Sequence, residues 1–195
     1  KPSSAISTAR VNFLAHLLDN GSDANLGFED GKFPPEKTIY LTLLRNTGIH
    51  KRIGREYLLD APTEESFLPL WKSCEAFLDS TKEKPRKLGE LIKILRSRPF
   101  KLKQGVIDLW LPAFLIIKKN DYSLYNDAGI YIHTITREVL DIMQKSPAGF
   151  SVKAFNVEGV KLDLFSKYRE ALGIIQDAEF TADSLIETIK PFLIF

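Results

Sequence analysis

The chain has 195 residues, 44% hydrophobic and 27% charged, a balance typical of a folded globular protein and not of a disordered one. Its longest apolar stretch, residues 106–117, is interrupted by Asp108 and Pro112, which excludes a membrane-spanning helix. A single cysteine, Cys74, cannot form an internal disulfide, which predicts a reducing, cytoplasmic compartment.

The N-terminal part of the chain, residues 1–81, is predicted to be a helical subdomain. Apolar side chains recur at helical spacing over residues 4–20 and again over residues 34–47, where a pair of prolines opens the second helix. Residues 55–59 favour a short extended segment. A third helix is expected to begin at Thr63, whose hydroxyl would cap it.

The next part, residues 82–157, is predicted to be a winged-helix-like module that begins with a charged linker. Helix, hairpin and strand patterns follow one another at residues 87–97, 105–118, 122–133, 136–146 and 150–155. The helix over residues 105–118 is apolar nearly all round, so we expect it to be buried. The predicted fold class is α+β, mostly helical with a small antiparallel sheet.

The C-terminal part, residues 158–195, is predicted to contain further helices. The chain ends on an apolar string, residues 190–195, and lacks an initiating methionine. These ends favour a fragment of a longer protein, truncated within its C-terminal helices, although a processed natural terminus is the alternative.

The positive charge of the chain is local. Residues 82–103 contain nine basic and two acidic side chains, whereas the whole chain has a net charge of +2. Basic side chains gathered on one face neutralise phosphates, so this segment is a candidate nucleic-acid surface; the alternative is a solvated helix face. The candidate contacts are Lys82, Lys84, Arg86, Lys87, Lys93, Arg96, Arg98, Lys101 and Lys103.

The hairpin tyrosines Tyr122, Tyr125 and Tyr131 have two interpretations as well. They could stack on bases or on a protein partner. Alternatively, they form cross-strand pairs that stabilise the hairpin itself.

No catalytic motif is present in the sequence. A phosphate-binding loop needs Gly-Lys-Ser/Thr, but Gly31-Lys32 is followed by Phe33. The histidines are isolated, so neither a metal site nor a cofactor is predicted, and His16 is expected to be a hydrogen-bonded core residue. Asp108 is expected to pair with Lys101, Lys103 or a capping group, and Cys74 to be a buried apolar group. The segment is therefore predicted not to be an enzyme.

Two blocks of residues carry a resemblance to a known family. The first consists of Phe33-Pro34-Pro35-Glu36-Lys37, Ile39-Tyr40-Leu41 and Thr47-Gly48-Ile49-His50, and the second of Pro99-Phe100-Lys101-Leu102-Lys103-Gln104-Gly105, Leu124-Tyr125 with Gly129, and Pro147 followed by Phe150. Both blocks are similar to regions downstream of the nucleotide-binding domain in very large bacterial P-loop ATPases of the BREX and Pgl phage-defence type.

The resemblance spans residues 30–155 in pattern and implies a cytoplasmic ATPase whose accessory modules mediate protein or DNA contacts. One departure counts against a DNA-reading wing, because the helix before the hairpin is too apolar to lie in a DNA groove. The leading hypothesis is a non-catalytic accessory module that contacts other domains of the parent chain or protein subunits. The alternative is a nucleic-acid-binding module that uses residues 82–103, and a stand-alone enzyme is a third.

Overall fold

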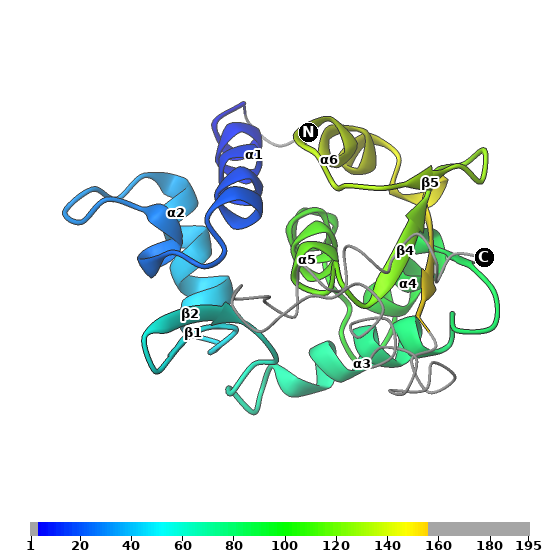
Figure 1. Cartoon of the computed structure of the whole chain (residues 1–195), viewed down its shortest axis with the longest axis horizontal. Helices are drawn as coiled ribbons and strands as arrows, with labels where there is room; N and C mark the ends of the chain where they lie inside the picture. The colour runs from blue at the N-terminus through cyan, green and yellow to red at the C-terminus, as the bar shows by residue number, and fades with distance from the viewer. Residues whose placement is uncertain (1–3, 156–195) are drawn as a thin grey trace, which may run out of the picture.

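The computed structural model describes residues 4–155, which form the α+β fold that the sequence predicts. Helix α5 (Gln104–Ile117) lies at the centre. On one side of it are α1 (Ser4–Asp19) and α2 (Pro35–Tyr40), and on the other is a small antiparallel sheet (Figure 1). Within this described part, every helix is too short or too polar to cross a bilayer.

Helices α1 and α2 form because their apolar positions repeat at helical spacing and pack together. The buried stripe of α1 consists of Ala9, Phe13, Leu14 and Leu17. Helix α2 continues into a π-helical turn, η2 (Leu41–Arg45), which closes when the Asn46 amide donates to the Leu41 carbonyl at 2.9 Å. The loop between them contains a short 3-10 helical turn, η1 (Ala24–Gly27).

A two-stranded hairpin, β1 (His50–Ile53) and β2 (Glu56–Leu59), follows η2. The sequence predicted only an extended passage near β2 and missed β1. The reason is that β1 carries two cations, Lys51 and Arg52, between its end residues, so it shows little apolar alternation.

The predicted start of the third helix at Thr63 is wrong. Helix α3 (Leu68–Asp79) begins five residues later. Thr63 lies instead against the turn at Thr47 and Gly48. Its amide donates to the Thr47 carbonyl at 3.0 Å, and its hydroxyl lies against Gly48, where an added Cβ would meet the oxygen at 1.9 Å. Gly48 also has φ +73°, a backbone conformation that favours glycine. Both this conformation and the close approach of Thr63 therefore require glycine at position 48.

The main sheet has the strand order β3-β6-β4-β5 and is antiparallel throughout. Strand β6 pairs with both β3 and β4, although the chain reaches it last. The strands are β3 (Arg86–Lys87), β4 (Tyr122–Tyr125), β5 (Tyr131–Ile132) and β6 (Ser151–Ala154). Between them run α4 (Leu88–Arg96), α5, α6 (Arg137–Lys145) and the turn η3 (Pro147–Gly149).

The expected burial of the apolar helix is confirmed. Seven of the ten residues from Ile107 to Ile116 are buried hydrophobic side chains, and Trp110 and Phe114 pack against Trp71 of α3. One continuous core extends from Phe13 in α1 to Val152 in β6. Because α5 contributes to this core along most of its length, it positions every surface described below.

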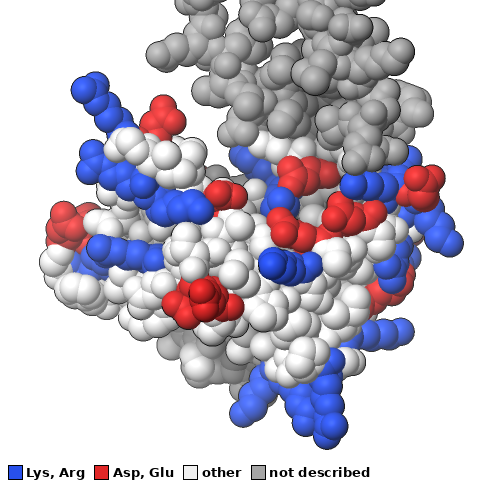
Figure 2. All heavy atoms as spheres, turned by 90° about the horizontal axis from the view of Figure 1, so that it is seen from below, with Lys and Arg blue, Asp and Glu red and all other residues white. Residues whose placement is uncertain are grey.

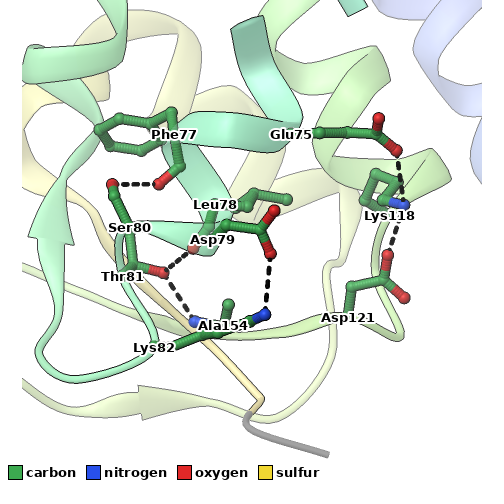
Figure 3. A network of polar contacts seen from close by, with 10 residues as sticks. All are labelled: Glu75, Phe77, Leu78, Asp79, Ser80, Thr81, Lys82, Lys118, Asp121 and Ala154. Atoms are coloured by element: carbon green, nitrogen blue, oxygen red, sulfur yellow. Dashed lines mark hydrogen bonds and ion pairs between the residues drawn. The ribbon is translucent and has the colours of Figure 1, made fainter. Parts of the chain in front are cut away.

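Thr81 joins α3 to the main sheet at the predicted boundary between residues 1–81 and 82–157. Its hydroxyl donates to the Leu78 carbonyl and accepts from the Ala154 amide, both at 2.7 Å (Figure 3). Thr81 is fully buried, whereas Ser80 before it and residues 83–85 after it are exposed. The division into domains stays a prediction, and the predicted segment 158–195 lies outside the described residues.

Candidate interaction surfaces

Eight of the nine predicted basic contacts separate into two groups in the structure. The first group is held by local acids and aromatics. Lys82 pairs with Asp79 at 3.1 Å and Lys87 with Asp127 at 2.6 Å. Arg86 lies over the Phe77 ring and pairs with Glu90 at 2.6 Å, and its hydrogen bond lowers the pKa of that carboxyl. These three cations therefore all form ion pairs within the chain.

The second group forms what we call the basic surface, made of Lys93, Arg96, Arg98, Lys101 and Lys103. All five side chains are exposed, and within residues 4–155 none is paired with an acid. Lys93 and Arg96 are one turn apart on α4, and the other three follow on the loop that leads into α5.

Backbone hydrogen bonds fold the loop of the basic surface against α4. The Leu102 amide donates to the Leu95 carbonyl at 2.9 Å, and the Lys101 amide to the Ser97 carbonyl at 2.8 Å. Figure 2 shows one face of the molecule, which is largely uncharged, with scattered cationic and anionic groups and a cluster of cations at one edge. Lys84, the remaining predicted contact, is exposed in the loop between α3 and β3.

An apolar groove of about 560 Å³ opens between α1, α2 and α5. Its walls are mostly aliphatic side chains and a proline. They are formed by Ala5, Ile6 and Ala9 of α1, Pro35 and Ile39 of α2, and Leu109 of α5. The sequence did not predict this groove, since it depends on the angle at which three distant segments pack.

Three polar side chains, Arg10, Gln104 and Asp108, also line the groove. Arg10 donates to Asp108 at 2.6 Å, and Gln104 donates to the other carboxylate oxygen of Asp108. Gln104 in turn accepts from Arg96. A continuous polar chain therefore connects α1, α5 and the basic surface on α4.

The predicted partners of Asp108 are wrong. The sequence favoured Lys101, Lys103 or a capping group, whereas the structure pairs Asp108 with Arg10, which is 98 residues away. A signal for this pairing was present, because Arg10 precedes Phe13, Leu14 and Leu17 on the buried stripe of α1. A cation on an apolar face requires an acid on the element that packs there.

Side chains elsewhere that could take part in catalysis or metal binding, such as His16 and Cys74, have structural roles. The His16 ring lies 3.1 Å from the Leu26 carbonyl and stacks on Phe28, which agrees with the expected hydrogen bond, although the side chain is only half-buried. Cys74 is buried, and burial raises the pKa of its thiol to about 12. Across residues 4–155, no three metal-binding side chains converge.

The hairpin tyrosines pack within the sheet. Tyr125 and Tyr131 are cross-strand partners with ring centroids 6.0 Å apart, which confirms the structural interpretation for this pair. Tyr122 is buried, and its hydroxyl donates to the Leu115 carbonyl of α5 at 2.7 Å.

The candidate surfaces are thus the basic surface and the groove, which lie side by side because Arg96 bonds to Gln104. No family model, no curated protein and no solved structure matches this chain.

Proposed function

We propose that this chain is a non-catalytic accessory module of a larger bacterial ATPase, which relays protein–protein or interdomain contacts. The observation that carries the interaction part is the open apolar groove between α1, α2 and α5. Apolar concavities on a folded domain mark binding sites, because exposing them to water is unfavourable. The ATPase part is supported by the resemblance of residues 30–155 to regions of those large proteins.

The topology of the second half supports a winged-helix-like module with an insertion. The order α3-β3-α4-α5-β4, closed by β6 between β3 and β4, follows the helix and strand sequence of that motif. Strand β5 and helix α6 are inserted before the closing strand. However, α5 occupies the position of the recognition helix, and α1 packs on it through Arg10 and Asp108. This cover favours protein contacts over reading of a DNA groove.

The proposal is tested on the parent protein by deleting residues 4–155. We expect ATP hydrolysis to remain measurable and the assembly with partner subunits, followed by size-exclusion chromatography with light scattering, to be lost. An assembly that survives the deletion would contradict the proposal, as would nucleotide turnover by the isolated chain.

The alternative, a nucleic-acid-binding module, is supported by the basic surface, since its five cations have no acidic partner within the described residues. Such a surface predicts duplex affinity whose logarithm falls linearly with the logarithm of salt concentration, by about 0.9 for each phosphate neutralised. Reversing three charges together, Arg96→Glu, Arg98→Glu and Lys101→Glu, should abolish this binding.

A matched triple variant, Arg55→Glu, Lys72→Glu and Lys145→Glu, changes the net charge equally at exposed positions outside the basic surface. Fluorescence anisotropy with a labelled duplex at several salt concentrations compares the two variants. Equal losses would show a general charge effect, and an affinity that does not vary with salt would eliminate the alternative.

A further inference from the structure

The groove combines two features that determine what it can accept. Its walls are aliphatic, so its occupant must present apolar side chains. Ala5 and Ala9 are small, and a Cβ built on Gly105 at the groove edge would meet no atom within 4 Å. The space is therefore open at the α1–α5 junction and has room for side chains from outside.

The rim of the groove is positively charged on one side. Along the polar chain, two arginines, Arg10 and Arg96, are connected to a single acid, Asp108. Lys103 directly precedes Gln104, Lys101 lies two residues before Lys103, and the N-terminal turn of α5 adds a positive partial charge. Neither lysine has an acidic partner within residues 4–155, so this rim has unneutralised charge.

The shape favours a helix as the occupant. Three helices form the walls, and an amphipathic helix fits such a groove by inserting apolar residues spaced i, i+3, i+4 and i+7. An extended strand would instead require an unpaired sheet edge, and the groove contains no strand. Nucleic acid is disfavoured inside the groove because its aliphatic walls offer phosphates no hydrogen bonds.

We infer that the groove binds an acidic amphipathic helix of a protein partner, whose apolar face packs against Ile6, Ile39 and Leu109 and whose acidic flank meets Arg96, Lys101 and Lys103. This inference rests on the proposed interaction function and names the partner class. The basic surface then provides orientation and electrostatic attraction, while the groove provides the apolar contact area.

The test uses the whole chain and two labelled synthetic peptides. Both have about 18 residues with leucines at the helical spacing of the groove; one has glutamates beside the leucines and the other has lysines. We expect the acidic peptide to bind at least about tenfold more tightly in fluorescence anisotropy. Absence of binding by the acidic peptide, or equal binding of both peptides, would overturn the inference.

Matched variants locate the binding. Ile6→Glu should weaken the acidic peptide by about tenfold or more, whereas Ile142→Glu, an equally exposed apolar residue on α6, should not (57% and 56% exposed). Ala5→Trp fills the groove without adding charge and should weaken binding as well. Arg96→Glu with Lys101→Glu should reduce the preference for the acidic peptide, and Arg55→Glu with Lys72→Glu should leave it unchanged.

Circular dichroism melting of each variant confirms that it is folded. Should neither peptide bind while deletion of residues 4–155 still disrupts the parent assembly, the inference fails and the proposed function survives. Duplex DNA that binds the chain when the acidic peptide does not would overturn the inference in favour of a nucleic-acid surface. A peptide affinity that Ile6→Glu and Ile142→Glu lower equally would also overturn it.

Discussion

Cys74 is a residue whose chemistry is controlled by its position in the core. It lies on α3 with no solvent exposure, and the Trp110 indole donates to its sulfur at 3.4 Å. Burial raises the pKa of the thiol to about 12, so almost no reactive thiolate exists at neutral pH. We expect iodoacetamide to label the native chain at pH 8 far more slowly than the urea-unfolded chain, as followed by mass spectrometry.

The control for this prediction is Lys72→Cys in a Cys74→Ala background. Position 72 is exposed on the same helix, so its thiol should react at close to the unfolded rate. Rapid labelling of native Cys74 would show that α3 opens readily to solvent.

His50 should make stability depend on pH. It is buried in β1, where its Nδ1 lies 2.9 Å from the Tyr40 hydroxyl, and burial lowers the pKa of the ring. The unfolded chain therefore binds this proton more readily than the folded chain does. As pH falls below about 6.5, the free energy of unfolding should decrease until the folded-state pKa is passed.

Urea titrations between pH 7 and pH 5 measure this decrease. The variant His50→Gln keeps an acceptor for Tyr40 but cannot titrate, so its slope should be shallower. Identical slopes for His50→Gln and the unmodified chain would contradict the assignment to His50.

At the scale of secondary-structure elements, Thr81 controls how α3 joins β6. Replacing it with valine preserves the shape but leaves the buried Ala154 amide without its acceptor. We expect Thr81→Val to lower the free energy of unfolding by about 1–3 kcal/mol. Chemical denaturation measures the change.

Thr42→Val is the matched control for Thr81. The Thr42 hydroxyl also donates to a helix carbonyl, that of Thr38 at 2.9 Å, but the side chain is exposed and accepts from no buried amide. Its replacement should change stability by less than about 0.5 kcal/mol. Similar losses for both variants would mean that the junction with β6 is not the cause.

At the scale of the whole molecule, the Arg10–Asp108 pair connects the N-terminal helix α1 to the central helix α5. The side chains are 9% and 20% exposed, so each charge depends on the other for compensation. We expect Arg10→Met to lower the free energy of unfolding by roughly 2–3 kcal/mol, because Asp108 is left without its cation. The double variant Arg10→Met with Asp108→Leu should recover more than half of that loss.

The comparison variant for this pair is Arg137→Met. Arg137 pairs with Asp19 at the surface, where solvent screens both charges, so its loss should matter little. If the double variant were as unstable as Arg10→Met, packing of the arginine stem and not charge pairing would explain the effect.

The sequence alone determined most elements of the described fold. Elements whose signals are local were predicted well: the helix over residues 4–20, the apolar helix over residues 105–118, the hairpin over residues 122–133 and the helix over residues 136–146. Periodicity and capping act over a few residues, so they can be identified without tertiary contacts. Local signals failed at Thr63, whose amide donates to the distant Thr47 carbonyl and whose hydroxyl lies against Gly48 instead of at a helix start.

Only the tertiary structure decided which surfaces the chain presents. The sequence identified nine basic residues. Only the structure shows that Lys82, Arg86 and Lys87 pair with Asp79, Glu90 and Asp127, whereas the cations of the basic surface have no acidic partner within residues 4–155. The groove depends on how α1, α2 and α5 pack, and Asp108 meets Arg10 across 98 positions of sequence. Helix and strand formation follow from local patterns, whereas charge pairing and concavity depend on distances that exist only once the chain has folded.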